Sequence, residues 1–189
     1  MAYSCIYIVA GPRSCGKSTF INRCREGRTG GILPTGVSGL ARAHGPIYFM
    51  ELGEHRPADA GELLVHVDLL SPFVGLMLSS VEELCARMKP EAFGEFPGAS
   101  LFSDCSDLRV LTLCVPRIVT LHRWLGRSIE LERSSVRTIM AQIYSDATGD
   151  AAYSALYDAW NHYIAGLPNA ATWNVYESSG GQTYSIAPA

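Results

Sequence analysis

Residues 6–18 are Ile6-Tyr7-Ile8-Val9-Ala10-Gly11-Pro12-Arg13-Ser14-Cys15-Gly16-Lys17-Ser18, and they carry the clearest structural signal in the chain. The short apolar run before Gly11 is rich in residues that favour strands and is typical of a buried one. Residues 19–25 have helical character, and Gly27 ends that helix. The sequence therefore predicts a strand, a glycine-containing loop and a helix in succession.

The rest of the chain alternates between strand and helix patterns. Apolar runs predict further strands at 47–50, 63–70, 110–115 and 172–176. Helical spacing and start or stop signals predict helices at 79–89, 118–125, 130–144 and 152–164. Strands that alternate with helices of this length predict an α/β fold, a three-layer sandwich with a mainly parallel central sheet, formed by residues 1–189 as a single domain.

The loop at 11–18 fits the spacing G-x-x-x-x-G-K-[ST] between a strand and a helix. Its glycines let successive backbone N–H groups face an anion, and the helix N-terminus adds partial positive charge. Lys17 supplies a mobile charge, and Ser18 supplies a hydroxyl oxygen for a metal ion. The candidate nucleotide-binding residues are Gly11, Pro12, Arg13, Ser14, Cys15, Gly16, Lys17, Ser18 and Thr19.

This motif, in its strand-loop-helix context, resembles the P-loop NTPases. The resemblance rests on residues 11–18 and implies a loop that holds the phosphates of ATP or another nucleoside triphosphate. It implies that Lys17 reaches the β- and γ-phosphates and that Ser18 binds Mg²⁺, the second expected cofactor. It also implies the α/β fold that the alternation of strands and helices predicts.

Within that superfamily the chain resembles the small-molecule and nucleotide kinases. It contains no Asn-Lys pair, which the base-reading motif of the GTPases requires. Asp68 is followed by Leu69, whereas the motor-like and AAA-type ATPases carry Asp-Glu at the end of a strand. The chain length and an arginine-bearing segment after the strand at 110–115 match the layout of the kinase group.

Arginines are concentrated after that strand. In the kinase group, arginines of a helical lid close over the phosphates, so the resemblance implies a lid around residues 117–137 with Arg123 and Arg127 as catalytic residues. The five arginines of the segment are Arg117, Arg123, Arg127, Arg133 and Arg137. A solvated helix face paired to Glu130 and Glu132 explains the same residues, and the sequence does not decide between the two.

Asp68 lies near the carboxyl end of the strand at 63–70, beside the expected loop. There it would hold Mg²⁺ or orient an attacking hydroxyl group, so it is both a candidate catalytic residue and a candidate metal ligand with Ser18. The alternative is a turn aspartate before Ser71. His66 shares its strand face and is interpreted as a buried core histidine.

Three further features have two interpretations each. The charged residues at 51–59 follow the second strand, where they fit either an acceptor site or a solvated turn. Residues 28–45 are rich in glycine and are interpreted as a loop or a flexible segment that faces the substrate. The aromatic stripe of Tyr153, Tyr157, Trp160 and Tyr163 has helical spacing, which favours core packing over base stacking.

Composition limits the partners. The net charge of −3 gives no basic field for a nucleic acid, which is therefore not expected as the principal partner. The sequence shows no secretory signal and no apolar stretch of about 20 residues, so no membrane association is expected. Six cysteines without paired short spacing indicate reduced thiols, and we expect a soluble cytoplasmic protein.

Two functions remain after the sequence analysis. The leading hypothesis is an ATP-dependent phosphotransferase that moves the γ-phosphoryl group to a small acceptor bearing a hydroxyl or a phosphate group. The alternative is a nucleotide-binding switch or regulatory NTPase that acts through a protein partner. The sequence identifies neither the acceptor nor the preferred base.

Overall fold

The computed structural model describes residues 3–30, 33–48, 61–73, 76, 80–95, 99–127, 134–145, 148–178 and 182–189. Its centre is one six-stranded sheet in the order β2-β3-β1-β4-β5-β6. The strands are β1 (Cys5–Gly11), β2 (His44–Tyr48), β3 (Glu62–Asp68), β4 (Leu108–Cys114), β5 (Ala170–Glu177) and β6 (Tyr184–Pro188). The first five are mutually parallel, and β6 pairs antiparallel with β5. The predicted α/β class with a mainly parallel sheet is confirmed.

Helices cover both faces of the sheet. They are α1 (Lys17–Arg25), the 3₁₀ helices η1 (Thr35–Ala41) and η3 (Ser71–Phe73), α2 (Val81–Arg87), α3 (Glu91–Gly94), α4 (Ser100–Asp104), α5 (Arg117–Leu125), α6 (Ser134–Ser145) and α7 (Gly149–Ala165). The predicted start of α2 is confirmed, because the Ser80 hydroxyl accepts a hydrogen bond from the Glu83 amide at 3.2 Å. The sheet thus forms the middle of three layers.

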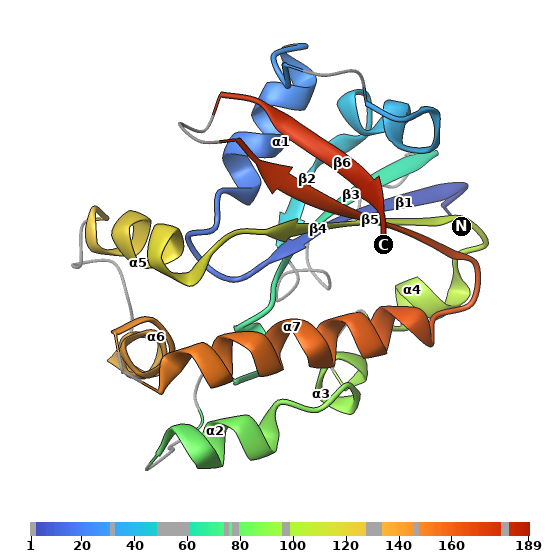
Figure 1. Cartoon of the computed structure of the whole chain (residues 1–189). Coiled ribbons are helices and arrows are strands. Elements are labelled where there is room, and N and C mark those ends of the chain that lie inside the picture. Colours follow the sequence, from blue (N-terminus) through green and yellow to red (C-terminus); the bar gives the residue numbers. More distant parts are fainter. Residues whose placement is uncertain are drawn as a thin grey trace.

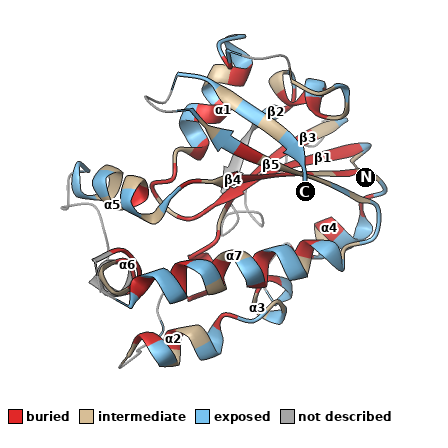
Figure 2. Cartoon of the chain, viewed as in Figure 1, coloured by how far each residue is buried: buried red, intermediate tan, exposed pale blue. Residues whose placement is uncertain are grey.

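Two apolar cores lie on either side of β1, which is buried along its whole length (Figure 2). On one face α1 and η1 contribute Phe20 and Leu40. On the other face α7 contributes Leu156 and Trp160, together with residues of α2 and α6. Figure 1 shows α1 and α7 on opposite faces of the sheet. The predicted core role of the aromatic stripe is confirmed, because Trp160 is fully buried and packs against Phe93 and Tyr163.

The interpretation of residues 28–45 as an irregular, substrate-facing loop is wrong for the part around η1. Val37 and Leu40 of η1 are buried, three residues apart, which matches one 3₁₀ turn. A Cβ atom at Gly39 would collide with the Tyr7 hydroxyl group, so glycine permits this close approach. The glycines that suggested a loop in fact allow a short helix to pack tightly against the sheet.

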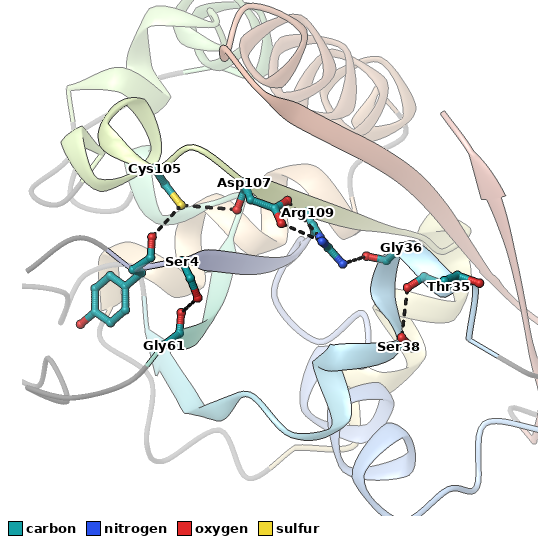
Figure 3. A network of polar contacts seen from close by, with 9 residues as sticks. Ser4, Thr35, Gly36, Ser38, Gly61, Cys105, Asp107 and Arg109 are labelled. Carbon is teal, nitrogen blue, oxygen red and sulfur yellow. Dashed lines mark hydrogen bonds and ion pairs between the residues drawn. The ribbon is translucent and has the colours of Figure 1, made fainter.

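A polar network fixes η1 at the amino ends of the strands (Figure 3). Arg109, at the start of β4, donates to the Gly36 carbonyl and forms a bidentate pair with Asp107 at 3.0 and 2.7 Å. Nearby, the Ser4 hydroxyl donates to the Gly61 carbonyl across the starts of β1 and β3. This edge is opposite to the carboxyl end of β1, where the glycine-containing loop begins.

Sequence analysis also missed other short or exposed elements. The helices α3 and α4 lie between the predicted helix at 79–89 and the predicted strand at 110–115, and each is only four or five residues long. The strand β6 is an edge strand whose residues are exposed or half-buried, so it lacks the apolar run used to find strands. Short or exposed elements give weak periodic signals.

Candidate functional site

The segment from Gly11 to Ser18 connects the end of β1 to the first turn of α1, as the sequence predicted. We call residues 11–18 the glycine loop. Because β1 lies between β3 and β4, the glycine loop lies where chain connections leave the sheet in opposite directions. The carboxyl ends of strands at such a point are the usual place for ligands in α/β sheets.

The backbone of the glycine loop has two residues in left-handed conformations. Ser14 has φ of 67° and Gly16 has φ of 106°. A side chain at Gly16 would be strained, and its Cβ atom would lie 3.1 Å from Arg123 Nη1. Alternation between right- and left-handed conformations makes a concave backbone that binds anions through its N–H groups. The loop therefore has the backbone shape of an anion cradle.

Lys17 lies inside the loop although it is one of the most strongly hydrated residue types. Its side chain is buried, and Nζ donates hydrogen bonds to the carbonyl oxygens of Gly11 at 2.6 Å and Pro12 at 2.8 Å. Its next contact is a weak one to Cys15 Sγ at 3.9 Å. An ammonium group has three donors, and the two carbonyls hold Lys17 across the loop. Lys17 is not among the residues that line the neighbouring cavity.

Asp68 is brought to the glycine loop, as predicted. It is the last residue of β3, and its Cα is paired in register with that of Gly11. Its Oδ2 accepts from Arg13 Nε at 2.9 Å, and its Oδ1 accepts from the Leu70 amide at 3.1 Å. The hydrogen bond from the Leu70 amide is the contact expected of a turn aspartate, which was the alternative interpretation of Asp68. Asp68 therefore both caps a turn and faces the glycine loop.

The residues around Asp68 fit a magnesium ion better than a transition metal. Among the described residues, no group of three or more His, Cys, Asp and Glu side chains is placed to hold a metal. Mg²⁺ is usually held by one or two protein oxygen ligands, with waters and substrate phosphates completing its shell. Asp68 and the exposed residue Ser18 carry side-chain oxygen atoms of this type.

Arg123 contacts the glycine loop from α5. Its Nη1 donates to the Cys15 carbonyl at 2.7 Å, and its Nη2 lies 2.5 Å from Glu177 Oε2 at the end of β5. Its guanidinium group is thus held between the loop and the sheet. This position does not agree with a fully solvated helix face. Glu130 and Glu132, the partners in that alternative interpretation, lie outside the described residues, so the pairing stays untested.

Arg123 lines a cavity of about 400 Å³ beside the glycine loop. The volume falls in the range of small-molecule sites. The lining includes three arginines and a single acidic side chain, which favours an anionic ligand. The lining residues are Ser14, Gly16, Thr19, Arg23, Arg123, Arg127 and Glu177.

Arg117 has a different position from the one expected of a lid arginine. Its guanidinium group pairs with Asp150 of α7 and donates to the Tyr144 carbonyl of α6 at 2.7 Å. It therefore connects three helices and is not among the residues lining the cavity. Arg133 and the charged cluster at 51–59 lie outside the described residues, as does the side chain of Arg137, so their predicted roles stay predictions.

Tyr144 is a contact of the glycine loop that sequence analysis missed. It is fully buried, and its hydroxyl group donates to the Arg13 carbonyl at 2.5 Å. Burial raises the pKa of Tyr144 well above its usual value, so the hydroxyl group stays a donor. Glu177 and Arg23 were missed as well, because each lies in an element whose pattern indicated only a strand or a helix.

His66 and Cys15 are neutral at physiological pH. Burial, followed by the nearby charge of Lys17, lowers the pKa of His66 to about 3. Burial likewise raises the pKa of the Cys15 thiol. His66 is buried on β3, which agrees with its interpretation as a core histidine. Lys17 and the arginines therefore provide the positive charge near the loop.

Comparisons with known proteins do not identify a family. No protein-family model matches the chain, and no curated protein matches it. Within the described part of the chain, every helix is too short or too polar to cross a membrane. The function is therefore argued from the site.

Proposed function

We propose that this chain is a P-loop phosphotransferase that binds a nucleoside triphosphate with Mg²⁺ at the glycine loop. It would transfer the γ-phosphoryl group of the nucleotide to an oxygen atom of a small acceptor bearing a hydroxyl or a phosphate group, with nucleoside diphosphate as the leaving group. The observation that carries the proposal is Lys17, a buried lysine held across a strand-to-helix loop by the Gly11 and Pro12 carbonyls. No carboxylate of the described residues pairs with this ammonium group, and a buried positive charge of this kind suits a phosphate ligand.

The glycine loop would bind the donor nucleotide. Its concave backbone and the N-terminus of α1 favour phosphate oxygens, and Lys17 would add a direct charge contact. Ser18 and Asp68 would hold Mg²⁺, which neutralises phosphate charge during phosphoryl transfer when it is bound. Asp68 or a neighbouring acid would orient the acceptor hydroxyl group.

The cavity supports a ligand that extends beyond the loop. It continues from Ser14 and Gly16 to Arg23 on α1 and Glu177 on β5. Arg123 and Arg127 line it from α5 and from the residues just after α5, where they would offset the charge that develops on the transferred group. Excluding water from that space would favour transfer to an acceptor over hydrolysis.

Acceptor-dependent turnover tests the proposal. The protein would be incubated with ATP or GTP, Mg²⁺ and a panel of nucleosides, nucleotides, sugars and small alcohols, while nucleoside diphosphate release is measured. We expect at least one acceptor class to raise turnover at least about tenfold above the rate with water alone.

The same assay separates the proposal from its alternative. If the protein binds the triphosphate but no acceptor in a broad panel stimulates turnover, a regulatory NTPase replaces the phosphotransferase. Stimulation that persists in Lys17→Ala would instead show that the activity belongs to another site or to a contaminant.

A further inference from the structure

Ser14 combines two unfavourable features in the middle of the glycine loop. Its φ of 67° lies in the left-handed region, where a residue with a Cβ atom is strained and glycine is not. Its side-chain oxygen is buried, and none of the described residues makes a hydrogen bond with it. A buried donor without a partner destabilises the folded chain. Glycine at this position would remove both costs.

Comparable residues of the described chain have only one of these features. Ser18 and Thr19, at the start of α1, are exposed, so water can satisfy their hydroxyl groups. Asn169 is the other described non-glycine residue with a left-handed backbone, and asparagine tolerates that conformation better than serine does. Among the residues that the structure describes, Ser14 alone has both a left-handed backbone and a buried hydroxyl group without a protein partner.

The backbone on both sides of Ser14 is held in place. The Arg13 carbonyl accepts from the Tyr144 hydroxyl group at 2.5 Å, and the Cys15 carbonyl accepts from Arg123 Nη1 at 2.7 Å. These contacts with α6 and α5 fix the left-handed turn, as is required where a strained conformation persists. Ser14 also lines the cavity beside the loop. Its hydroxyl group therefore belongs to a rigid, concave part of the backbone that suits an anion.

We propose that the Ser14 hydroxyl group donates a hydrogen bond to a phosphate oxygen of the bound nucleotide, in addition to the contacts of the backbone N–H groups and Lys17. The inference rests on the proposed function and adds a side-chain contact to it. A hydrogen bond to a charged oxygen is stronger than one between neutral groups, so the phosphate is a favourable partner for this donor. Serine then lowers the stability of the loop but improves its binding of the ligand.

Replacing Ser14 should change stability and affinity in opposite directions. Ser14→Gly is expected to raise the melting temperature by about 2 °C or more, because it removes the strain and the buried hydroxyl group. The same variant should bind ATP with Mg²⁺ about tenfold more weakly, as expected for a lost hydrogen bond to a charged group. Ser14→Ala keeps the Cβ atom and should show the same loss of affinity. Thermal melting and calorimetric titration measure the two quantities.

Asn169→Gly is the matched control. It also replaces a left-handed residue by glycine, but it lies just before β5 at the amino edge of the sheet, so it should leave ATP affinity unchanged. Inorganic triphosphate serves as a second probe, because Ser14 lines the cavity and could instead contact the nucleoside. We expect the two Ser14 variants to lose the same affinity for inorganic triphosphate as for ATP.

Several results would overturn the role of Ser14. Wild-type affinity in either Ser14 variant would show that the hydroxyl group is not used, and a loss in Ser14→Gly alone would indicate that only backbone rigidity matters. A loss confined to ATP would place the contact at the nucleoside. Lower melting temperatures in both variants would show that the hydroxyl group stabilises the loop itself. If the wild type fails to bind ATP with Mg²⁺, the proposed function fails as well, whereas wild-type binding with unchanged Ser14 variants removes only this inference.

Discussion

Two arginine–aspartate pairs lie at opposite edges of the same sheet, and they differ in construction. At the amino edge, Arg109 and Asp107 are two residues apart and form a bidentate pair at 3.0 and 2.7 Å. At the carboxyl edge, Arg13 and Asp68 are 55 residues apart and share one contact, from Nε to Oδ2. The first pair has two hydrogen bonds to break, whereas the second has one.

The two pairs also differ in how firmly their surroundings hold them. Arg109 also donates to the Gly36 carbonyl and lies over the Tyr7 ring, 5.7 Å from its centroid. Asp107 is close to Arg109 in the chain, and the Gly36 carbonyl and the Tyr7 ring carry no net charge. Because Gly36 belongs to η1, the amino-edge pair fixes η1 to the sheet. The carboxyl-edge pair adjoins a loop with left-handed residues and a buried lysine. The amino-edge pair holds η1 against the sheet, whereas the carboxyl-edge pair lies beside the glycine loop, the proposed nucleotide site.

The largest difference should appear when the two aspartates are replaced. Asp68→Asn is expected to lower magnesium-dependent turnover by about 100-fold, because the proposed metal ligand is lost. Asp107→Asn should leave turnover within about twofold of the wild type, since the amino edge is remote from the glycine loop. Steady-state release of nucleoside diphosphate measures both, and similar losses in the two variants would remove the distinction between the edges.

The cavity arginines should affect turnover more than nucleotide affinity. Arg123→Ala and Arg127→Ala are each expected to lower kcat about 10- to 100-fold while triphosphate affinity changes less than about fivefold. Their contribution would come from charge that develops during transfer. Arg87→Ala, an exposed arginine on α2, is the matched control. A kcat equal to that of the wild type in both cavity variants would show that these arginines have only a structural role.

At the amino edge the expected effect is on stability. Arg109→Leu removes the partner of Asp107 and of the Gly36 carbonyl, and it should lower the free energy of unfolding by about 1–2 kcal/mol, a range that allows for the partial exposure of the pair. Denaturant unfolding measures this change. The ATP affinity of Arg109→Leu should stay at the wild-type value, and a marked loss of affinity would show that the two edges are coupled.

Tyr144→Phe should have the smallest effect. It removes one hydroxyl group and leaves the Arg13 carbonyl without that donor, at a cost of about 1 kcal/mol. If the hydrogen bond positions the glycine loop, the cost should appear as an approximately fivefold loss of ATP affinity at nearly unchanged melting temperature. Tyr157→Phe is measured as the control. A decrease in the melting temperature of Tyr144→Phe without a loss of ATP affinity would show that Tyr144 serves core packing only.

The sequence predicted the parts of the site that depend on local pattern. The strand, the glycine loop and the helix are adjacent in the chain, so their residues show the motif directly. Asp68 was predicted because parallel strands place their carboxyl ends along one edge of a sheet. The unconfirmed part is chemical function, which the fold does not determine.

Contacts between distant elements were not predictable in the same way. Glu177 and Tyr144 reach the site through β5 and α6, and nothing in their neighbouring residues distinguishes them from ordinary strand and helix positions. Arg117 looked like a lid arginine, but Asp150, 33 residues away, binds it. Partner choice among charged side chains depends on tertiary packing, which a periodic pattern does not contain.

Lys17 offers the most direct test of the account, since it is one of two lysines in the chain and Lys89 is an exposed counterpart. Calorimetric titration with ATP and Mg²⁺ should show saturable binding to the wild type and to Lys89→Ala. Lys17→Ala should bind at least about 100-fold more weakly, as expected for the loss of a buried charge contact to phosphate. Equal affinities of Lys17→Ala and Lys89→Ala would contradict the assignment of the glycine loop as the triphosphate site.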